Sequence, residues 1–217
     1  MGRVTEDATS LAYSCMATPT CALKGPNISY ALTIAAVTQA LRVLLRESLA
    51  AGRVDALLGK EVSVSVLPPD RVAEQGPAPG LNLFHYGISH GDRWQRSRVP
   101  GAAAGRGASP GLGLDLHYLL TAFATEDLHA EVLLGHAVQC FEDRPVVSGE
   151  ALGHALARSN LAGVADRSAA GLANRVQSIQ VMPRPTTDEA LFSIWQALST
   201  PYRPTLAYDV RLVIDAR

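Results

Sequence analysis

The chain has 217 residues, 47% of them apolar and 18% charged, and its 19 lysines and arginines nearly balance 20 aspartates and glutamates. This length suits one domain that buries most of the surface its unfolded form exposes. The charge balance argues against nucleic acid or an acidic membrane as a general partner, because both require a basic face. Three cysteines, Cys15, Cys21 and Cys140, are too few for a disulfide framework or a four-ligand zinc site, which favours a reducing compartment.

Residues 1–26 show neither helical nor strand periodicity and end in Gly25-Pro26, a pair typical of loops. We predict an N-terminal extension here, either a flexible tail or a docking arm that needs a partner surface. Translation that begins at Met16 is a further alternative. The remaining residues, 27–217, are predicted to form a single domain.

The first periodic segment follows Asn27, a suitable helix N-cap, and predicts a long amphipathic helix that ends at Gly52. Its apolar tract is interrupted by Gln39, Arg42, Arg46 and Glu47. These side chains exclude a membrane span, and the tract lies too far from the first residue for an ordinary signal peptide. We therefore expect no membrane insertion and a soluble protein that is made and first used in the cytoplasm.

Two short strands are predicted next, at Val62–Val66 and Leu81–Ile88, and Pro68-Pro69 must end the first because proline cannot donate to a ladder. Residues 89–111 then form a loop rich in glycine and arginine. A loop of this length is usually functional or disordered, so we predict either a basic partner-binding loop or a solvated insertion. Its arginines are Arg93, Arg96, Arg98 and Arg106.

Two segments carry the clearest strand pattern, 112–123 and 205–215, because every second residue in each is apolar. The opposite faces are more polar. They carry Asp115, His117 and Thr121 in one segment and Asp209, Arg211 and Asp215 in the other. Both segments are therefore predicted to be half-buried strands of one sheet that has one side on a core.

Helices are predicted after Thr125 and Ser148, and a weakly alternating strand is predicted at Val176–Met182. Thr186 and Glu189 form a capping box before a helix whose apolar stripe includes Trp195. Helices and strands thus mix along the chain. The predicted class is α/β or α+β, a mixed β-sheet with amphipathic helices on one face.

No motif for catalysis, for a cofactor or for a metal rises above chance. His129 and Glu131 have the H-x-E spacing of zinc deaminases without the cysteine pair that completes the metal site. Asp115 and His117 could form an acid–base pair, but no motif places a nucleophile beside them. The glycine-rich segment matches neither a Walker loop nor a Rossmann fingerprint. We therefore predict no catalytic, cofactor-binding or metal-binding residues, and we predict that the protein is not an enzyme.

Three stretches resemble a known family: LNLFHYGI, the run from PGLGLDLHYLLTAF to EDRPVV, and the run from IQVMPRP to the C-terminus. The two most specific pieces of this resemblance are LDLHYLLTA and WQALSTPYRPTLAY. These residues resemble the tail-cap, or tube-terminator, proteins of contractile injection systems, phage-tail-like particles typified by antifeeding prophage and Photorhabdus virulence cassettes. The resemblance begins near Ile28, so it assigns no role to residues 1–26.

The resemblance implies a fold similar to phage tail terminators and a structural rather than enzymatic role. It further implies a homohexameric ring that ends the inner tube and the sheath at the baseplate-distal end, in a particle that can be released from the cell. Expected partners are therefore other copies of the chain, the sheath protein and the inner tube protein. Direct contact with nucleic acid is not expected.

Two surfaces are predicted to bind these partners. The terminal strand is taken as a sheet edge that a neighbouring subunit or a sheath strand can extend, and the basic loop as a contact for an acidic rim of tube or sheath. The candidate residues are Arg93, Arg96, Arg98, Arg106, Asp209, Arg211 and Asp215. Two other classes stay open, a small-ligand-binding module that uses the face of Asp115 and His117, and a hydrolase with an unrecognised site.

Overall fold

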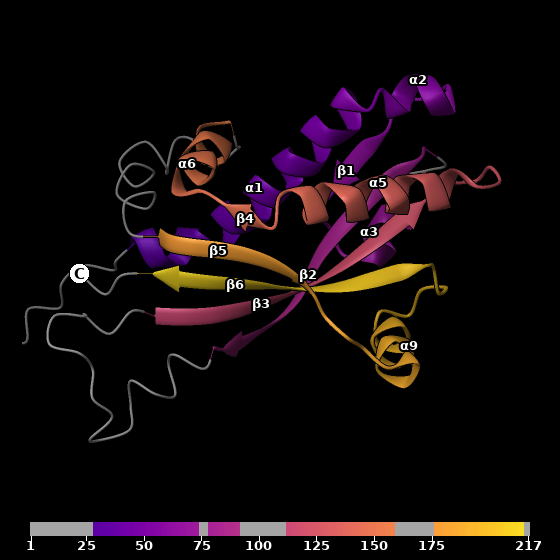
Figure 1. Ribbon diagram of the computed structural model, residues 1–217. Coiled ribbons are helices and arrows are strands. Elements are labelled where there is room, and N and C mark those ends of the chain that lie inside the picture. The colour runs from indigo at the N-terminus through magenta and orange to yellow at the C-terminus, as the bar shows by residue number, and fades with distance from the viewer. Residues whose placement is uncertain (1–27, 74–77, 92–111, 159–175, 215–217) are drawn as a thin grey trace, which may run out of the picture.

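A computed structural model describes residues 28–73, 78–91, 112–158 and 176–214. Its centre is a six-stranded sheet with the order β1-β2-β3-β6-β5-β4, in which only the β1–β2 pair is parallel (Figure 1). The strands are β1 (Ser63–Ser65), β2 (Gly80–His90), β3 (Leu112–Phe123), β4 (Val146–Val147), β5 (Val176–Pro183) and β6 (Thr205–Ile214). The predicted extension, residues 1–26, lies outside the described residues.

The helices of the described chain are α1 (Ile28–Ala51), α2 (Val54–Leu58), α3 (Pro69–Ala73), α5 (His129–Asp143), α6 (Gly149–Ala157) and α9 (Asp188–Ala197). Helices α1, α5 and α6 lie together over one face of the sheet, whereas α9 lies on the opposite side, between β5 and β6 in the chain (Figure 1). The predicted mixed α+β class is confirmed. The arrangement with helices on one face holds for α1, α5 and α6, and α9 is the exception.

The alternation predicted for β3 and β6 is confirmed over most of both strands, and it defines the main core. Two positions differ, because Leu206 is 38% exposed and Thr121, on the opposite face, is fully buried. Residues Leu116, Tyr118 and Leu120 of β3 are buried together with Tyr208, Val210 and Leu212 of β6. Helix α1 supplies the opposing layer through Val37, Leu41 and Leu45. The one polar group in this layer of β3, the Tyr118 hydroxyl, forms a 2.8 Å hydrogen bond with Thr38 Oγ1. A buried hydroxyl is tolerated when it is satisfied in this way.

Strand β6 lies in the middle of the sheet, so the prediction of a free terminal edge is wrong. Arg211 lies opposite Asp115 of β3 on one side and opposite Gln180 of β5 on the other. Alternation reports which face of a strand is buried, because the side-chain period is two, but it says nothing about the neighbours on either side. The edges of the sheet are the short strands β1 and β4.

The sequence predicted the start of one helix correctly and the starts of two others with a shift of one or more residues. Ser148 Oγ accepts a hydrogen bond from the Ala151 amide at 3.2 Å, as predicted for α6. The cap of α9 is Thr187, one residue after the predicted Thr186. Helix α5 begins at His129 rather than after Thr125, because residues 124–128 turn first and Leu128 has a positive φ of 65°.

Two further features correct or limit the predicted organisation. Strand β2 continues to His90, so the predicted loop 89–111 begins later than expected, and its residues 92–111 lie outside the described chain. Within the described ranges, no helix combines the length and apolarity that a bilayer crossing needs.

Candidate functional site

Polar side chains gather on the face of the sheet opposite α1, α5 and α6. We call this cluster the polar face; it consists of Ser89, Asp115, His117, Arg184, Asp209 and Arg211. Asp115 lies opposite Arg211, and His117 opposite Asp209, in the β3–β6 register. The alternation of both strands puts these four residues on one face, as predicted.

His117 is the centre of this cluster. Its Nδ1 lies 2.6 Å from Asp209 Oδ1, and its Nε2 lies 3.0 Å from Ser89 Oγ. A carboxylate can only accept hydrogen bonds, so Nδ1 carries the proton. In the neutral imidazole, Nε2 is then an acceptor for the Ser89 hydroxyl. Three strands, β2, β3 and β6, thus contribute one link each to a serine–histidine–aspartate chain.

Arg184 adds a cation to the same cluster. Its guanidinium Nη1 donates to Asp209 Oδ1 at 3.0 Å and lies 2.6 Å from His117 Nδ1. A guanidinium only donates, and Nδ1 of His117 already carries a proton, so these two nitrogens do not hydrogen-bond to each other. The hydrogen bond of Arg184 Nη1 therefore goes to Asp209 Oδ1. The Arg184 amide donates to the Ala207 carbonyl at 2.9 Å, which fixes the segment after β5 against β6. Asp209 therefore accepts from two donors.

Asp115 is paired with Arg211, whose Nε donates to Asp115 Oδ1 at 3.2 Å. The Asp115–His117 acid–base pair that the sequence allowed is therefore not formed. Residues two apart on a strand share a face but are farther from each other than residues directly opposite on the neighbouring strand. Each of the two side chains pairs with its cross-strand neighbour on β6.

A β-bulge in β2 shapes the margin of the cluster. The β2–β3 register shifts between His85 and Gly87, and the Tyr86 ring lies 5.9 Å from the His117 ring. Burial raises the pKa of Tyr86 above its usual value. On the other face, burial lowers the pKa of His85, whose ring lies 5.1 Å from Tyr118. The bulge thus lies next to two partly buried histidines, His85 on one face of the sheet and His117 on the other.

A serine–histidine–aspartate chain is also the arrangement that activates a nucleophilic serine, so its chemistry needs a direct test. Two observations argue against turnover. Ser89 lies within strand β2, whereas the nucleophile of an α/β-hydrolase lies on a sharp turn that also forms the oxyanion hole. Proton transfer to His117 would also create a second cation beside the Arg184 guanidinium.

We therefore predict that Ser89→Ala leaves the basal hydrolysis of p-nitrophenyl acetate unchanged. The matched control is Ser193→Ala, which removes an exposed serine of α9 that bonds only the Glu189 carbonyl among the hydrogen bonds described. Labelling of the parent protein by a fluorophosphonate, lost in Ser89→Ala and kept in Ser193→Ala, would show that the serine is activated after all.

The other predicted binding residues lie outside this cluster. Asp209 and Arg211 belong to the polar face, but Arg93, Arg96, Arg98, Arg106 and Asp215 lie outside the described residues. Sequence reasoning missed Ser89 and Arg184. Ser89 follows the predicted end of its strand, and Arg184 lies between two prolines where no periodicity could indicate its direction. In the described ranges, no group of three or more histidine, cysteine or acidic residues could hold a metal ion.

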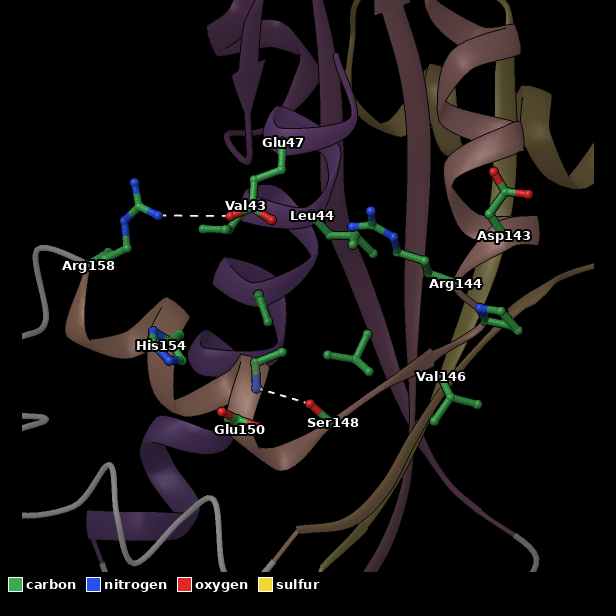
Figure 2. Close-up of a pocket in the computed structure, with 14 residues that line it drawn as sticks. Val43, Leu44, Glu47, Asp143, Arg144, Val146, Ser148, Glu150, His154 and Arg158 are labelled. Carbon is green, nitrogen blue, oxygen red and sulfur yellow. Dashed lines mark hydrogen bonds and ion pairs between the residues drawn. The ribbon is translucent and has the colours of Figure 1, made fainter. Parts of the chain in front are cut away.

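A second concave region lies on the helical side, and we call it the α1–α6 groove (Figure 2). It has a volume of about 660 Å³ and lies between α1, the end of α5, β4 and α6. Its apolar lining includes Val43, Leu44 and Val146, and at its rim Arg158 approaches Glu47 at 3.9 Å. Sequence periodicity did not predict this groove, because β4 and the end of α5 meet α1 only in the folded chain.

Comparison with known proteins places the chain in a family. A family model described as the Pvc16 N-terminal domain matches residues 36–217, and the chain belongs to this family. The fold is similar to that of the PVC sheath/tube terminator of an extracellular contractile injection system in its extended state. That similarity has a TM-score of 0.53 and 17% sequence identity, over 85% of this chain and 57% of that chain.

A second solved structure, the tube-terminating cap of the anti-feeding prophage, aligns with a TM-score of 0.44 and 15% identity over 72% of this chain and 48% of that chain. No curated protein matches the sequence. The chain spans little more than half the length of the terminator whose fold it shares. The predicted family resemblance is confirmed by the match over residues 36–217.

Proposed function

We propose that this protein is a structural cap of a contractile injection system, which ends the inner tube and the sheath at the end away from the baseplate. The observation that carries this proposal is the Pvc16 N-terminal domain match over most of the chain. The terminator-like fold supports it. In this proposal the protein is not an enzyme, and it works as part of an extracellular particle.

We propose further that the cap is a homohexameric ring that contacts the sheath protein and the inner tube protein. A closed ring requires heterologous contacts, in which one surface of a subunit meets a different surface of the next. The end of the molecule near α9 supplies a candidate surface. Phe192 is 59% exposed and Tyr202 53% exposed, and Leu128 of the α5 N-terminus is 72% exposed. Leu128 and Tyr202 line one surface depression and Phe192 and Tyr202 line a neighbouring one, so the three side chains form a continuous apolar region of the kind that marks protein contacts.

The polar face is the second candidate contact surface. Its acidic side chains, Asp115 and Asp209, are already paired with arginines of the same chain. A partner that covers this face would therefore not leave a lone charge buried, which is the costly case. Paired charges at an interface favour correct orientation more than raw affinity.

The proposal is tested in cells that produce the complete particle. Deletion of the gene should give sheaths and tubes of abnormal length by electron microscopy, and a plasmid copy of the parent gene should restore uniform, capped particles. The variant Phe192→Asp should fold normally and fail to restore them, because a charge replaces an exposed apolar contact. Ser193→Asp adds the same charge at the adjacent exposed position and is the matched control. Capped particles of normal length in the deletion strain would exclude the proposed function.

A further inference from the structure

The α1–α6 groove presents an apolar surface that the described chain leaves open. Val146 is 60% exposed, although valine is among the residues most often buried. Val43 and Leu44 of α1 line the groove beside it and are only partly buried (Figure 2). The volume of about 660 Å³ lies within the range of ~300–1,000 Å³ that is typical of sites for small ligands, enough space for a few side chains.

The backbone of β4 adds hydrogen-bonding groups to the same place. The Val181 amide of β5 donates to the Pro145 carbonyl at 2.8 Å, so Pro145 faces β5. Successive residues of an antiparallel strand point their backbone groups to opposite sides, so the amide and carbonyl of Val146 point away from β5. Strand β4 is the last strand on this side of the described sheet. An extended segment that lies here can therefore use both backbone bonds and apolar contacts.

The chain itself contains a segment of suitable chemistry. Residues 8–23 (ATSLAYSCMATPTCAL) carry no charged side chain and include Leu11, Tyr13, Met16 and Leu23. Segments that stay unfolded in water are typically rich in charge and poor in apolar side chains, and this segment is the reverse. All of it is outside the family match, which begins at residue 36, so a partner that all family members share does not account for it.

The segment can reach the groove of its own chain. The first groove residue of α1 is Ala40, twelve residues after the start of α1 at Ile28. At about 1.5 Å per helical residue this is about 18 Å. The seven steps from Cys21 to Ile28 span up to about 24 Å when extended, so Cys21 and the residues before it can cover this distance. We propose that residues 8–23 bind in the α1–α6 groove of the same chain, where they cover Val146 and pair with the open edge of β4.

A cysteine cross-link tests this contact in the full-length protein. The segment carries Cys15 and Cys21, and Cys140 is buried and so less reactive. We would place a new cysteine in the groove with Ala151→Cys, and a matched one on α9 with Ala190→Cys. Both alanines are exposed in the first turn of a helix, and each donates its amide to the capping hydroxyl. A short bis-maleimide joins thiols without requiring disulfide geometry.

Residues held in the groove have a high effective concentration there, so we expect roughly tenfold more cross-link to Cys15 or Cys21 from Ala151→Cys than from Ala190→Cys. Peptide mapping identifies the joined cysteines, and the Cys15→Ser/Cys21→Ser background should abolish the product. Mixing isotope-labelled and unlabelled chains shows whether the link lies within one chain. Equal yields at the two positions, or links mainly between chains, would overturn the proposal.

Hydrogen exchange gives an independent readout. In the parent protein the Val146 amide should exchange at least about tenfold more slowly than in the variant Leu11→Asp/Tyr13→Asp, because a charged segment cannot enter an apolar groove without a cost. The exchange of core amides in β3, such as that of Leu120, should be the same in both proteins. Unchanged exchange at Val146 would show that something other than residues 8–23 covers the groove, or that nothing does.

Discussion

The variant Arg211→Pro should fail to fold into a stable subunit. Proline removes the backbone donor of a residue that lies between β3 and β5, with Asp115 opposite it on one side and Gln180 on the other. In the middle of a sheet this breaks a ladder bond, and the fixed ring geometry adds strain. We expect a loss of about 3 kcal/mol or more, against a total stability of roughly 5–15 kcal/mol for a domain.

Arg211→Thr is the matched control for this effect. It keeps the backbone amide and removes only the exposed ion pair with Asp115, which should cost about 0–1 kcal/mol. Urea unfolding followed by circular dichroism measures both variants. If Arg211→Pro unfolds at the same urea concentration as Arg211→Thr, the central position of β6 is wrong and the earlier expectation of a free edge regains support.

Trp195→Ala should cost about 3–5 kcal/mol, because it empties the site of a large buried side chain. Trp195 is 2% exposed, and its ring meets the Tyr202 ring edge-on at 5.7 Å. The sequence predicted this burial correctly. It did not predict that α9, which carries Trp195, lies on the side of the sheet away from the main core.

Phe192→Ala is the comparison for this prediction, because it removes an aromatic side chain from the same helix at a position 59% exposed. A surface change of this kind is expected to stay within about 0.5 kcal/mol. Unfolding in urea, with the slope checked for two-state behaviour, gives both values. Nearly equal midpoints for Trp195→Ala and the parent would mean that α9 contributes little to the fold.

The local sequence pattern was enough to predict which face of each strand is buried. It was not enough to predict which strands lie side by side in the sheet. The alternation in 112–123 and 205–215 gave the buried side of β3 and β6 correctly, because each strand reports its own period. The order β3-β6-β5 depends on contacts between distant parts of the chain. Asp115 and Arg211, for example, are 96 residues apart. No local pattern contains both residues, so the sequence could not show which strands lie beside the terminal strand. Its predicted edge position was wrong for this reason.

The polar face shows the same division. The sequence placed Asp115, His117, Asp209 and Arg211 on the open side of their strands, and the structure confirms this. The sequence could not identify the partner of His117, because pairing depends on register, and a register is fixed only when two strands meet. Arg184 could not have been found at all. It belongs to no periodic element, and only the backbone bond to Ala207 brings it to Asp209.

The central position of β6 also bears on how the subunit is made by the ribosome. Strands β3 and β5 are synthesised before β6, and neither pairs with the other in the finished sheet. At a translation rate of about 5–20 residues per second, several seconds pass between the synthesis of β3 and that of β6, the strand that lies between β3 and β5. A chain interrupted before residue 205 therefore presents unpaired strand edges and cannot complete the sheet, which makes it prone to aggregation. Only a fully translated subunit therefore has the complete six-stranded sheet.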